Sequence, residues 1–185
     1  MKVTMPLSEW TFLVELVQRI KTESAAMGYV DIEGDRLLVH DLFVPEQVVT
    51  GATFEIDQTS LGKMAEENRT ERNLDPSRIR FQWHSHGAMS TGPSSVDHNN
   101  VIDLLKCSGT WLLTMIMNRS LDYTLQLDTV TPAASVRGLA LYVPDARLDR
   151  ALAAVQDRPK VLAAWPGNKR GPTVLPDEYE WQTMF

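Results

Sequence analysis

The residues of this chain that are best suited to chemistry lie between positions 84 and 97. His84 and His86 are separated by one residue, at the end of an apolar run with strand-like composition. Alternate side chains of a β-strand point to the same face, so both imidazoles would project together, with Cα atoms about 7 Å apart. This separation suits two imidazole nitrogens that bind one metal ion at about 2.0–2.1 Å.

A third ligand is available shortly after the histidines. A loop of glycine, serine, threonine and proline residues lets the chain turn back, and Asp97 follows it with a carboxylate. Three protein ligands with a fourth position open to water are typical of catalytic zinc sites. Simpler interpretations remain open, because histidines often lie at the surface or pair in the core, and Ser94 with Asp97 forms a plausible helix-capping pair. Capping and metal binding are compatible, since a rigid helix start would hold Asp97 in place.

The segments around these residues predict a mixed α/β (α+β) domain. Apolar residues at helical spacing predict a first helix from about Ser8 to Lys21 with Ser8 as its N-cap, and the polar range 58–72 permits a second helix. A third helix is expected through Val101 and Leu104. Short apolar runs broken by turn residues predict strands, over 25–45 (a hairpin turning at 33–35), 53–57, 79–86, 111–118, 121–130 and 136–144. We therefore expect a mixed, mostly antiparallel sheet flanked by helices.

Length and composition narrow the possible classes of protein. The 185 residues suit a single domain, which we expect over 1–158, with a short helix at 146–157 and a Pro- and Gly-containing tail over 159–185. Acidic residues outnumber basic ones by 24 to 18, which argues against nucleic acid as a partner. The single cysteine, Cys107, excludes a Cys₄ or Cys₂His₂ zinc site. No apolar run suits a signal peptide or a membrane span, so we expect a cytoplasmic protein with no membrane partner.

At the level of motifs, the sequence resembles the JAMM (MPN+) family of zinc metalloproteases. The resemblance rests on His84-Ser85-His86, seven intervening residues, Ser94, two further residues and Asp97. Family members carry a glutamate after the first helix and shortly before a glycine, and Glu23 lies in that position. The resemblance covers roughly residues 7–130 and implies an MPN (JAB-like) single domain. The proline that often follows the second histidine is Gly87 here, which we expect to loosen the loop without removing a ligand.

The resemblance also implies a function and a role for each site residue. One zinc ion per chain would be bound by His84, His86 and Asp97, with Glu23 as general base and Ser94 as oxyanion donor. The reaction would be hydrolysis of the amide bond after the C-terminal glycine of a ubiquitin-like protein, in deconjugation or maturation. The expected partners are that modifier or its conjugates and E1/E2-like proteins of a bacterial conjugation system, some of which act in antiviral defence. The polar stretch 58–80 would form one wall of the channel for the glycine tail.

Two other functions remain open from the sequence. A non-catalytic MPN scaffold is one, although all five expected site positions are filled. A RadC-like protein of unsettled activity is the other. It shares the His-x-His and Ser-x-x-Asp pattern, but the asparagine between the histidines and the Pro-Ser-Gly after them are absent here.

Five residues compete for roles in the site. Glu33 precedes a glycine in an expected turn and Glu15 falls on the polar side of the first helix, so we interpret both as solvated charges. His98 directly follows Asp97 and would point elsewhere on a helix, and His40 would face solvent or a neighbour at the end of a strand. Cys107 has no histidine nearby in sequence and is expected to be a buried, unreactive thiol.

Overall fold

The computed structural model describes residues 1–49 and 54–145. Met1–Val143 form one compact unit, and a second unit begins at Pro144. The helix expected over 146–157, the domain end expected at 158 and the tail over 159–185 all lie outside the described residues.

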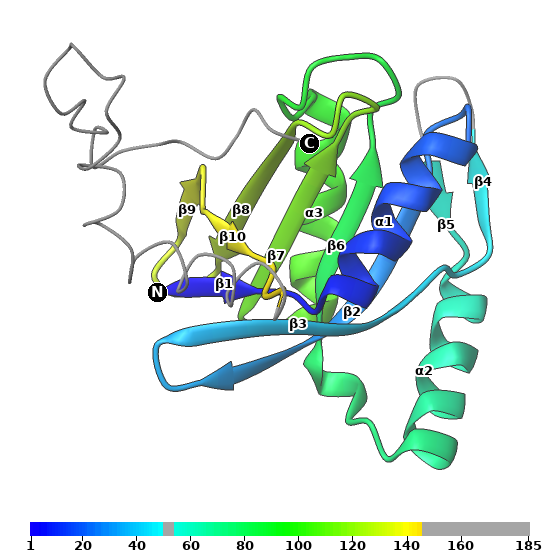
Figure 1. Cartoon of the computed structure of the whole chain (residues 1–185). Coiled ribbons are helices and arrows are strands. Elements are labelled where there is room, and N and C mark those ends of the chain that lie inside the picture. Colours follow the sequence, from blue (N-terminus) through cyan, green and yellow to red (C-terminus); the bar gives the residue numbers. More distant parts are fainter. Residues whose placement is uncertain (50–53, 146–185) are drawn as a thin grey trace, which may run out of the picture. The chain divides into compact units, whose positions relative to one another are not determined.

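The first unit has a mixed α/β fold built on an eight-stranded sheet, which Figure 1 shows from one face. The strand order is β10-β1-β3-β2-β6-β7-β8-β9, and a separate two-stranded sheet pairs β4 with β5. The strands are β1 (Lys2–Thr4), β2 (Ala25–Glu33), β3 (Arg36–Phe43), β4 (Gln47–Val49), β5 (Phe54–Ile56), β6 (Ile79–Ser85), β7 (Trp111–Met117), β8 (Tyr123–Thr129), β9 (Ala134–Arg137) and β10 (Leu141–Tyr142). Four of the seven strand pairs described in the large sheet are antiparallel. The predicted fold class is therefore confirmed.

Of the three α-helices in the described residues, two cover opposite faces of this sheet. Helix α1 (Leu7–Arg19) lies in front of the sheet in Figure 1, and α3 (Ser95–Ser108) lies behind it. Helix α2 (Gln58–Arg72) precedes a short 3₁₀ helix, η1 (Pro76–Arg78), that leads into β6. None of the helices in the described part of the chain is long and apolar enough to cross a lipid bilayer.

Strand β6 separates two cores and thereby positions the histidines. Phe81 and Trp83 are fully buried on the face that also receives Leu13 and Val17 of α1. Because side chains alternate along a strand, His84 must point to the opposite face, where Ala25 and its neighbours form a second apolar cluster. The alternation of side chains along the strand thus determines that the imidazole faces the side of the sheet that α3 covers.

Three details of the elements differ from the sequence-based expectation. Helix α1 starts at Leu7 with Pro6 at the N-cap, and no side chain caps it, so the predicted cap at Ser8 is wrong. The single strand expected over 136–144 is two short strands, because Gly138 takes a left-handed φ of 72° between them. Strands β1 and β4 are each three residues long and were not predicted.

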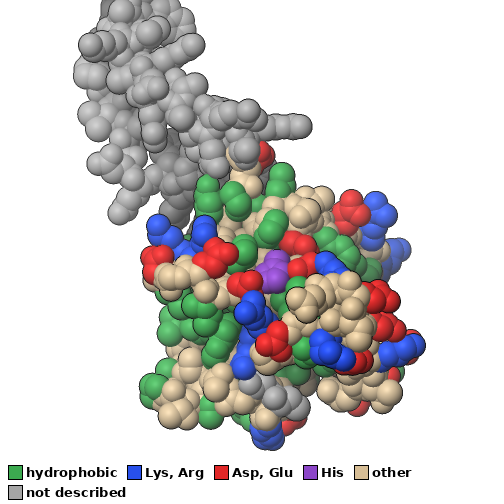
Figure 2. All heavy atoms as spheres, turned by 90° about the horizontal axis from the view of Figure 1, so that it is seen from below, with side chains coloured by type: hydrophobic (Ala, Val, Ile, Leu, Met, Phe, Trp, Pro, Cys, Tyr) green, Lys and Arg blue, Asp and Glu red, His purple; other side chains and the backbone are tan. Residues whose placement is uncertain are grey.

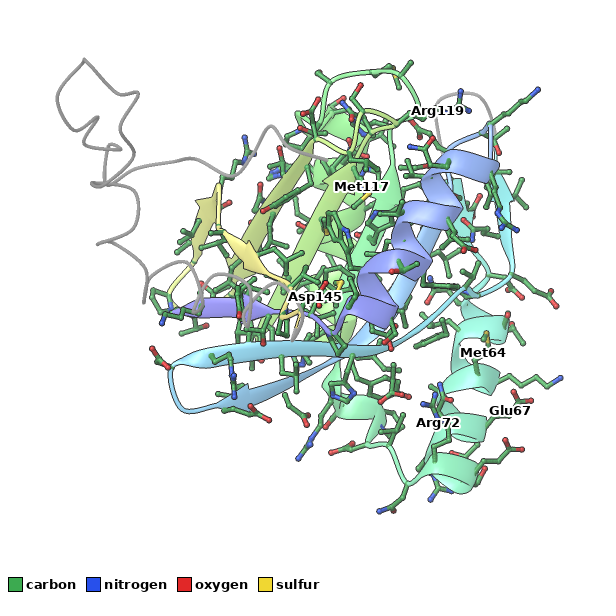
Figure 3. The ribbon with its side chains drawn as sticks, viewed as in Figure 1. Met64, Glu67, Arg72, Met117, Arg119 and Asp145 are labelled. Carbon is green, nitrogen blue, oxygen red and sulfur yellow. The ribbon has the colours of Figure 1, made fainter. Side chains whose placement is uncertain are left out.

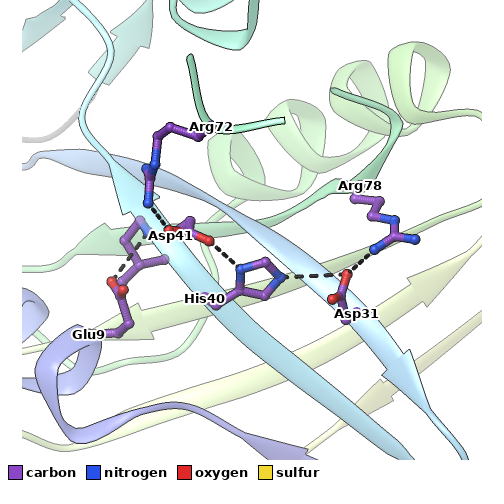
Figure 4. A network of polar contacts seen from close by, with 7 residues as sticks. Glu9, Asp31, His40, Asp41, Arg72 and Arg78 are labelled. Atoms are coloured by element: carbon purple, nitrogen blue, oxygen red, sulfur yellow. Dashed lines mark hydrogen bonds and ion pairs between the residues drawn. The ribbon is translucent and has the colours of Figure 1, made fainter. Parts of the chain in front are cut away.

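A network of charged residues fixes α2 and η1 to the β2–β3 hairpin (Figure 4). Asp41 of β3 accepts a hydrogen bond from Arg72 and lies 2.5 Å from His40 Nδ1. Asp31 of β2 accepts a hydrogen bond of 2.8 Å from Arg78. Figure 2 looks at this end of the molecule from below and shows acidic and basic side chains interspersed over it. Polar contacts therefore hold the mainly hydrophilic helix α2 beside the sheet.

The burial of β6 leads to a stability prediction. Trp83 has an exposed fraction of 0%, so Trp83→Ala should lower the free energy of unfolding by about 3–5 kcal/mol through lost contacts and a residual cavity. Chemical denaturation followed by circular dichroism measures the change. The control is Val48→Ala, at a side chain that is 72% exposed, where we expect a change within about 0.5 kcal/mol. A loss below about 1 kcal/mol for Trp83→Ala would contradict the described core.

Candidate metal centre

Three buried side chains converge at the end of β6 and the start of α3. His84 Nε2 lies 3.1 Å from His86 Nε2 and 3.1 Å from Asp97 Oδ1, and His86 Nε2 lies 3.3 Å from Asp97 Oδ2. In a tetrahedral site with ligands at about 2.0–2.1 Å from the ion, the ligand atoms are about 3.3 Å apart. The structure therefore brings the three predicted ligands together, with one donor atom of each within 4.8 Å of the others, so that they could hold one metal ion.

The sheet holds the two histidines in register. His84 lies opposite Ala25 of β2 on one side and Ile116 of β7 on the other. His86 follows the last residue of β6, and its backbone N–H donates a 2.9 Å hydrogen bond to the carbonyl of Met117. The His84 ring also packs against Phe54 of β5, with 5.2 Å between ring centroids. Backbone pairing and one aromatic contact thus restrict both imidazoles.

The loop between His86 and Ser94 is anchored to the turn after β7. Gly87 has a φ of 54°, which proline cannot adopt, and its carbonyl accepts a 2.8 Å hydrogen bond from the N–H of Arg119. The Asn118 side chain donates to the carbonyl of Met89 at 3.2 Å. Figure 3 shows Met117 at the end of β7 and Arg119 just beyond it. Hydrogen bonds to this turn thus anchor the loop that begins at Gly87.

Asp97 is held by the cap of its own helix. Ser94 Oγ accepts a hydrogen bond from the N–H of Asp97 at 3.2 Å, and Asp97 Oδ2 accepts one from the N–H of Ser94 at 2.6 Å. This reciprocal pair is a capping box. The capping interpretation is therefore confirmed, and it coexists with the placement of Asp97 beside both histidines.

Hydrogen bonds to the imidazole rings favour metal binding. His86 Nδ1 lies 2.7 Å from the carbonyl oxygen of Ser90, which can only accept a hydrogen bond, so Nδ1 carries the hydrogen. Nε2 is then free of hydrogen in the neutral ring and faces the other two candidate metal ligands. Burial alone would raise the pKa of Asp97, but hydrogen bonds from His84 and His86 hold this pKa well below its usual range. The hydrogen bond to Asp97 in turn raises the pKa of His86. A metal cation would take the place of the protons that these groups share.

Glu23 lies beside the three candidate ligands. Ser85 N–H donates to the carbonyl of Ser24 at 2.9 Å, and Ala25 lies opposite His84. Continuing this antiparallel register two residues beyond the Ala25–His84 pair puts Glu23 opposite His86, on the same face of the sheet. Its side chain is buried, and burial raises the pKa of its carboxyl, an effect that the nearby His86 and His84 only partly offset.

Ser94 has an exposed side chain next to this buried group. Its Oγ accepts from the N–H of Asp97, so the hydroxyl hydrogen remains to be donated to another acceptor. The cap therefore leaves Ser94 able to donate a hydrogen bond from the solvent-facing side of the site.

The competing residues lie outside the converging group. Glu33 is exposed and pairs with Arg36 at 2.5 Å, and Glu15 pairs with Arg19 at 3.5 Å on the exposed side of α1. His98 is exposed and borders a cavity beside the site, but it is not among the three converging donors. His40 belongs to the network of Figure 4. The side chain of Cys107 lies outside the described part of the chain.

Two residues that shape the site were missed in the sequence. The Gln47 side-chain amide accepts from the Ala25 N–H at 2.8 Å and donates to its carbonyl at 2.9 Å, which holds β4 against the start of β2. Phe54 then contacts His84 from β5. The range 58–80, expected as a wall of the channel for the glycine tail, forms α2, η1 and the first two residues of β6. Neither residue has a local signal, because each acts through a side-chain contact with a residue far away in the sequence.

Comparisons with known proteins bear on the fold. Comparisons with protein-family models and with curated proteins gave no match. Among solved structures, the chain is similar to the solution structure of protein DSY2949 from Desulfitobacterium hafniense, with a TM-score of 0.56 and 13% sequence identity. The match covers 78% of this chain and 96% of that chain. At this level of identity the similarity concerns the fold alone.

The converging donors lead to a prediction about metal content. Protein purified without added metal should contain one zinc ion per chain, and His86→Ala should lose most of it, because two protein ligands bind far more weakly than three. Elemental analysis by mass spectrometry measures both. The exposed neighbour provides the control, since His98→Ala should keep the full content. Stoichiometric zinc in His86→Ala would show that the ion is bound elsewhere.

Proposed function

We propose that this protein is a zinc-dependent amide hydrolase of the JAMM type, which cleaves after the C-terminal glycine of a ubiquitin-like protein. One observation carries the proposal. The Nε2 atoms of His84 and His86 lie 3.1 Å apart, and each lies 3.1–3.3 Å from one oxygen of Asp97. The buried carboxyl of Glu23 lies beside them. Three protein ligands leave a position for water, and a neighbouring carboxyl can exchange protons with that water.

The donor set favours zinc over other common ions. Two imidazoles and one carboxylate suit a borderline-soft ion in tetrahedral geometry, whereas Mg²⁺ and Ca²⁺ prefer six or more oxygen ligands. Zinc when bound supplies a water of lowered pKa, about 7, and a Lewis acid that polarises the scissile carbonyl.

Glu23 would handle the protons of the reaction. Its carboxylate takes a proton from the attacking water and later gives that proton to the nitrogen of the leaving amine. Burial raises the pKa of the Glu23 carboxyl, which brings its proton affinity closer to that of the groups it must serve near neutral pH. The water oxygen first bonds to the carbonyl carbon, which moves charge onto the carbonyl oxygen. The C–N bond then breaks as the nitrogen takes up the proton, and the protein forms no acyl intermediate.

Ser94 would stabilise the charge that develops on the carbonyl oxygen. Its Oγ is already oriented by the N–H of Asp97, so its hydroxyl hydrogen needs little reorganisation to reach a substrate oxygen. The rigid helix start that positions Asp97 therefore positions this donor as well.

The substrate class rests on the resemblance to the JAMM family, with support from the edge of β4. Among the described residues, β4 pairs on one edge only, with β5. The side chain of Val48 on β4 is 72% exposed. An extended peptide can add to such a strand edge through backbone hydrogen bonds. Glycines at the end of the peptide would carry no side chain to clash beside the buried ligands.

A substitution at the proposed base separates catalysis from metal binding. Glu23→Gln should keep the zinc content and thermal midpoint but lower kcat at least about 10²-fold, because the amide cannot accept the proton. Steady-state cleavage of a ubiquitin-like fusion encoded beside the gene measures the loss. The matched control is Glu33→Gln, at an exposed carboxylate in the β2–β3 hairpin, which should cleave normally. Near-normal turnover by Glu23→Gln would assign the base to another group.

A substitution in the substrate tests the specificity. Replacing the last glycine of the modifier with leucine should block cleavage, because a side chain would clash in a narrow path, whereas a surface substitution remote from its tail should have no effect. Product formation is followed by mass spectrometry. Equally efficient cleavage of unstructured peptides without a folded modifier would make the protein a general peptidase.

A further inference from the structure

A cavity lies beside the metal centre, between α3 and the strands β7, β8 and β9. His84 and Asp97 border it on one side, and Arg137 of β9 borders it on the other. His98 and Val101 of α3 line the cavity as well. A group bound at the metal centre could therefore share this space with a guanidinium.

The strands contribute a polar row to this cavity. Thr114 of β7 lies opposite Gln126 of β8, which lies opposite Arg137 of β9, so the three side chains share one face of the sheet. Thr114 and Gln126 both have an exposed fraction of 6%. A sheet face beneath a helix is ordinarily apolar, and a buried polar side chain is costly unless it forms hydrogen bonds. This row makes one wall of the cavity polar.

Two buried side chains hold Arg137 in place. The amide nitrogen of Gln126 donates to both carboxylate oxygens of Asp128, at 2.8 and 2.7 Å. A carboxylate accepts only, so this bond fixes the orientation of the amide and turns its oxygen to Arg137 Nε, which donates at 2.5 Å. Within the described residues, this is the hydrogen bond that the Arg137 side chain makes. The bond at Nε leaves both terminal amino groups of the guanidinium available.

We propose that Arg137 binds a carboxylate of the substrate and so sets a preference for acidic groups near the scissile bond. The proposal extends the proposed hydrolase and rests on it for the identity of the substrate. A guanidinium presents paired N–H groups that match the two oxygens of a carboxylate, and peptide substrates carry that group at acidic side chains or at the C-terminus. The fixed Nε reduces the entropy lost on binding.

The test measures binding, which requires no turnover. The zinc-loaded Glu23→Gln variant is titrated, by calorimetry or NMR, with four acetylated peptides: Gly-Gly-Ala as acid and as amide, and the amides of Gly-Gly-Asp and Gly-Gly-Asn. One acid should bind about 10–100-fold more tightly than its neutral counterpart. A preference in the alanine pair assigns the carboxylate to the C-terminus, and one in the aspartate pair assigns it to a side chain.

Substitutions at Arg137 decide whether this residue is responsible. Adding Arg137→Gln should remove the preference while zinc content and thermal midpoint stay unchanged, and Arg137→Lys should keep a reduced preference through its charge alone. The matched control is Arg19→Gln, at an arginine whose side chain is 77% exposed on α1, which should bind as the parent does.

Each remaining outcome overturns the proposal. An acid preference that survives Arg137→Gln would show that the metal alone holds the carboxylate, and equal binding of acids and neutral peptides would show that no carboxylate is recognised. Failure of the proposed function is distinguishable. If wild-type protein cleaves no fusion substrate yet the acid preference depends on Arg137, the cavity is a carboxylate site and the hydrolase assignment is wrong.

Discussion

The position of Asp97 constrains the rest of the site, because one carboxylate serves two parts of the fold. Asp97 Oδ2 accepts a hydrogen bond from the N–H of Ser94, the N-cap residue of α3. Asp97 Oδ1 lies 3.1 Å from His84 Nε2, and Oδ2 lies 3.3 Å from His86 Nε2. Helix α3 therefore cannot move away from the end of β6 without breaking the cap or separating the donors. The loop bonds to Arg119 and Asn118 keep the intervening chain in the shape that this arrangement requires.

The burial of this group is informative because it opposes stability. Glu23, His84, His86 and Asp97 each have an exposed fraction of 7% or less. Burying titratable side chains is costly unless their charges are compensated, and a divalent cation compensates two carboxylates at once. Such clusters of perturbed groups are typical of functional sites. The apolar face of β6, filled by Phe81 and Trp83, provides the stability that the opposite face gives up.

Several features of this site could be predicted from local sequence, and others could not. The strand period of two puts His84 and His86 on one face, and Ser94 with Asp97 shows a helix start. The role of Glu23 was predicted from the resemblance to the JAMM family alone. Glu23 is about sixty residues from the histidines in sequence, and only the pairing of β2 with β6 brings it close to them. Phe54 acts through ring packing against a residue thirty positions away, and the backbone carbonyl of Ser90 is a hydrogen-bond acceptor that any residue could supply. The prediction of an N-cap at Ser8 was wrong because α1 begins one residue earlier, at Leu7, with Pro6 at the N-cap.

The coordination of the bound ion tests the central claim most directly. X-ray absorption at the zinc edge, on protein purified without chelator, should show four nitrogen or oxygen ligands at about 2.0 Å and the outer scattering of two imidazoles. A sulfur ligand at about 2.3 Å or a shell of six oxygens would contradict the assignment of His84, His86 and Asp97 as the protein ligands. Absence of zinc from the purified protein would contradict the proposed hydrolase itself.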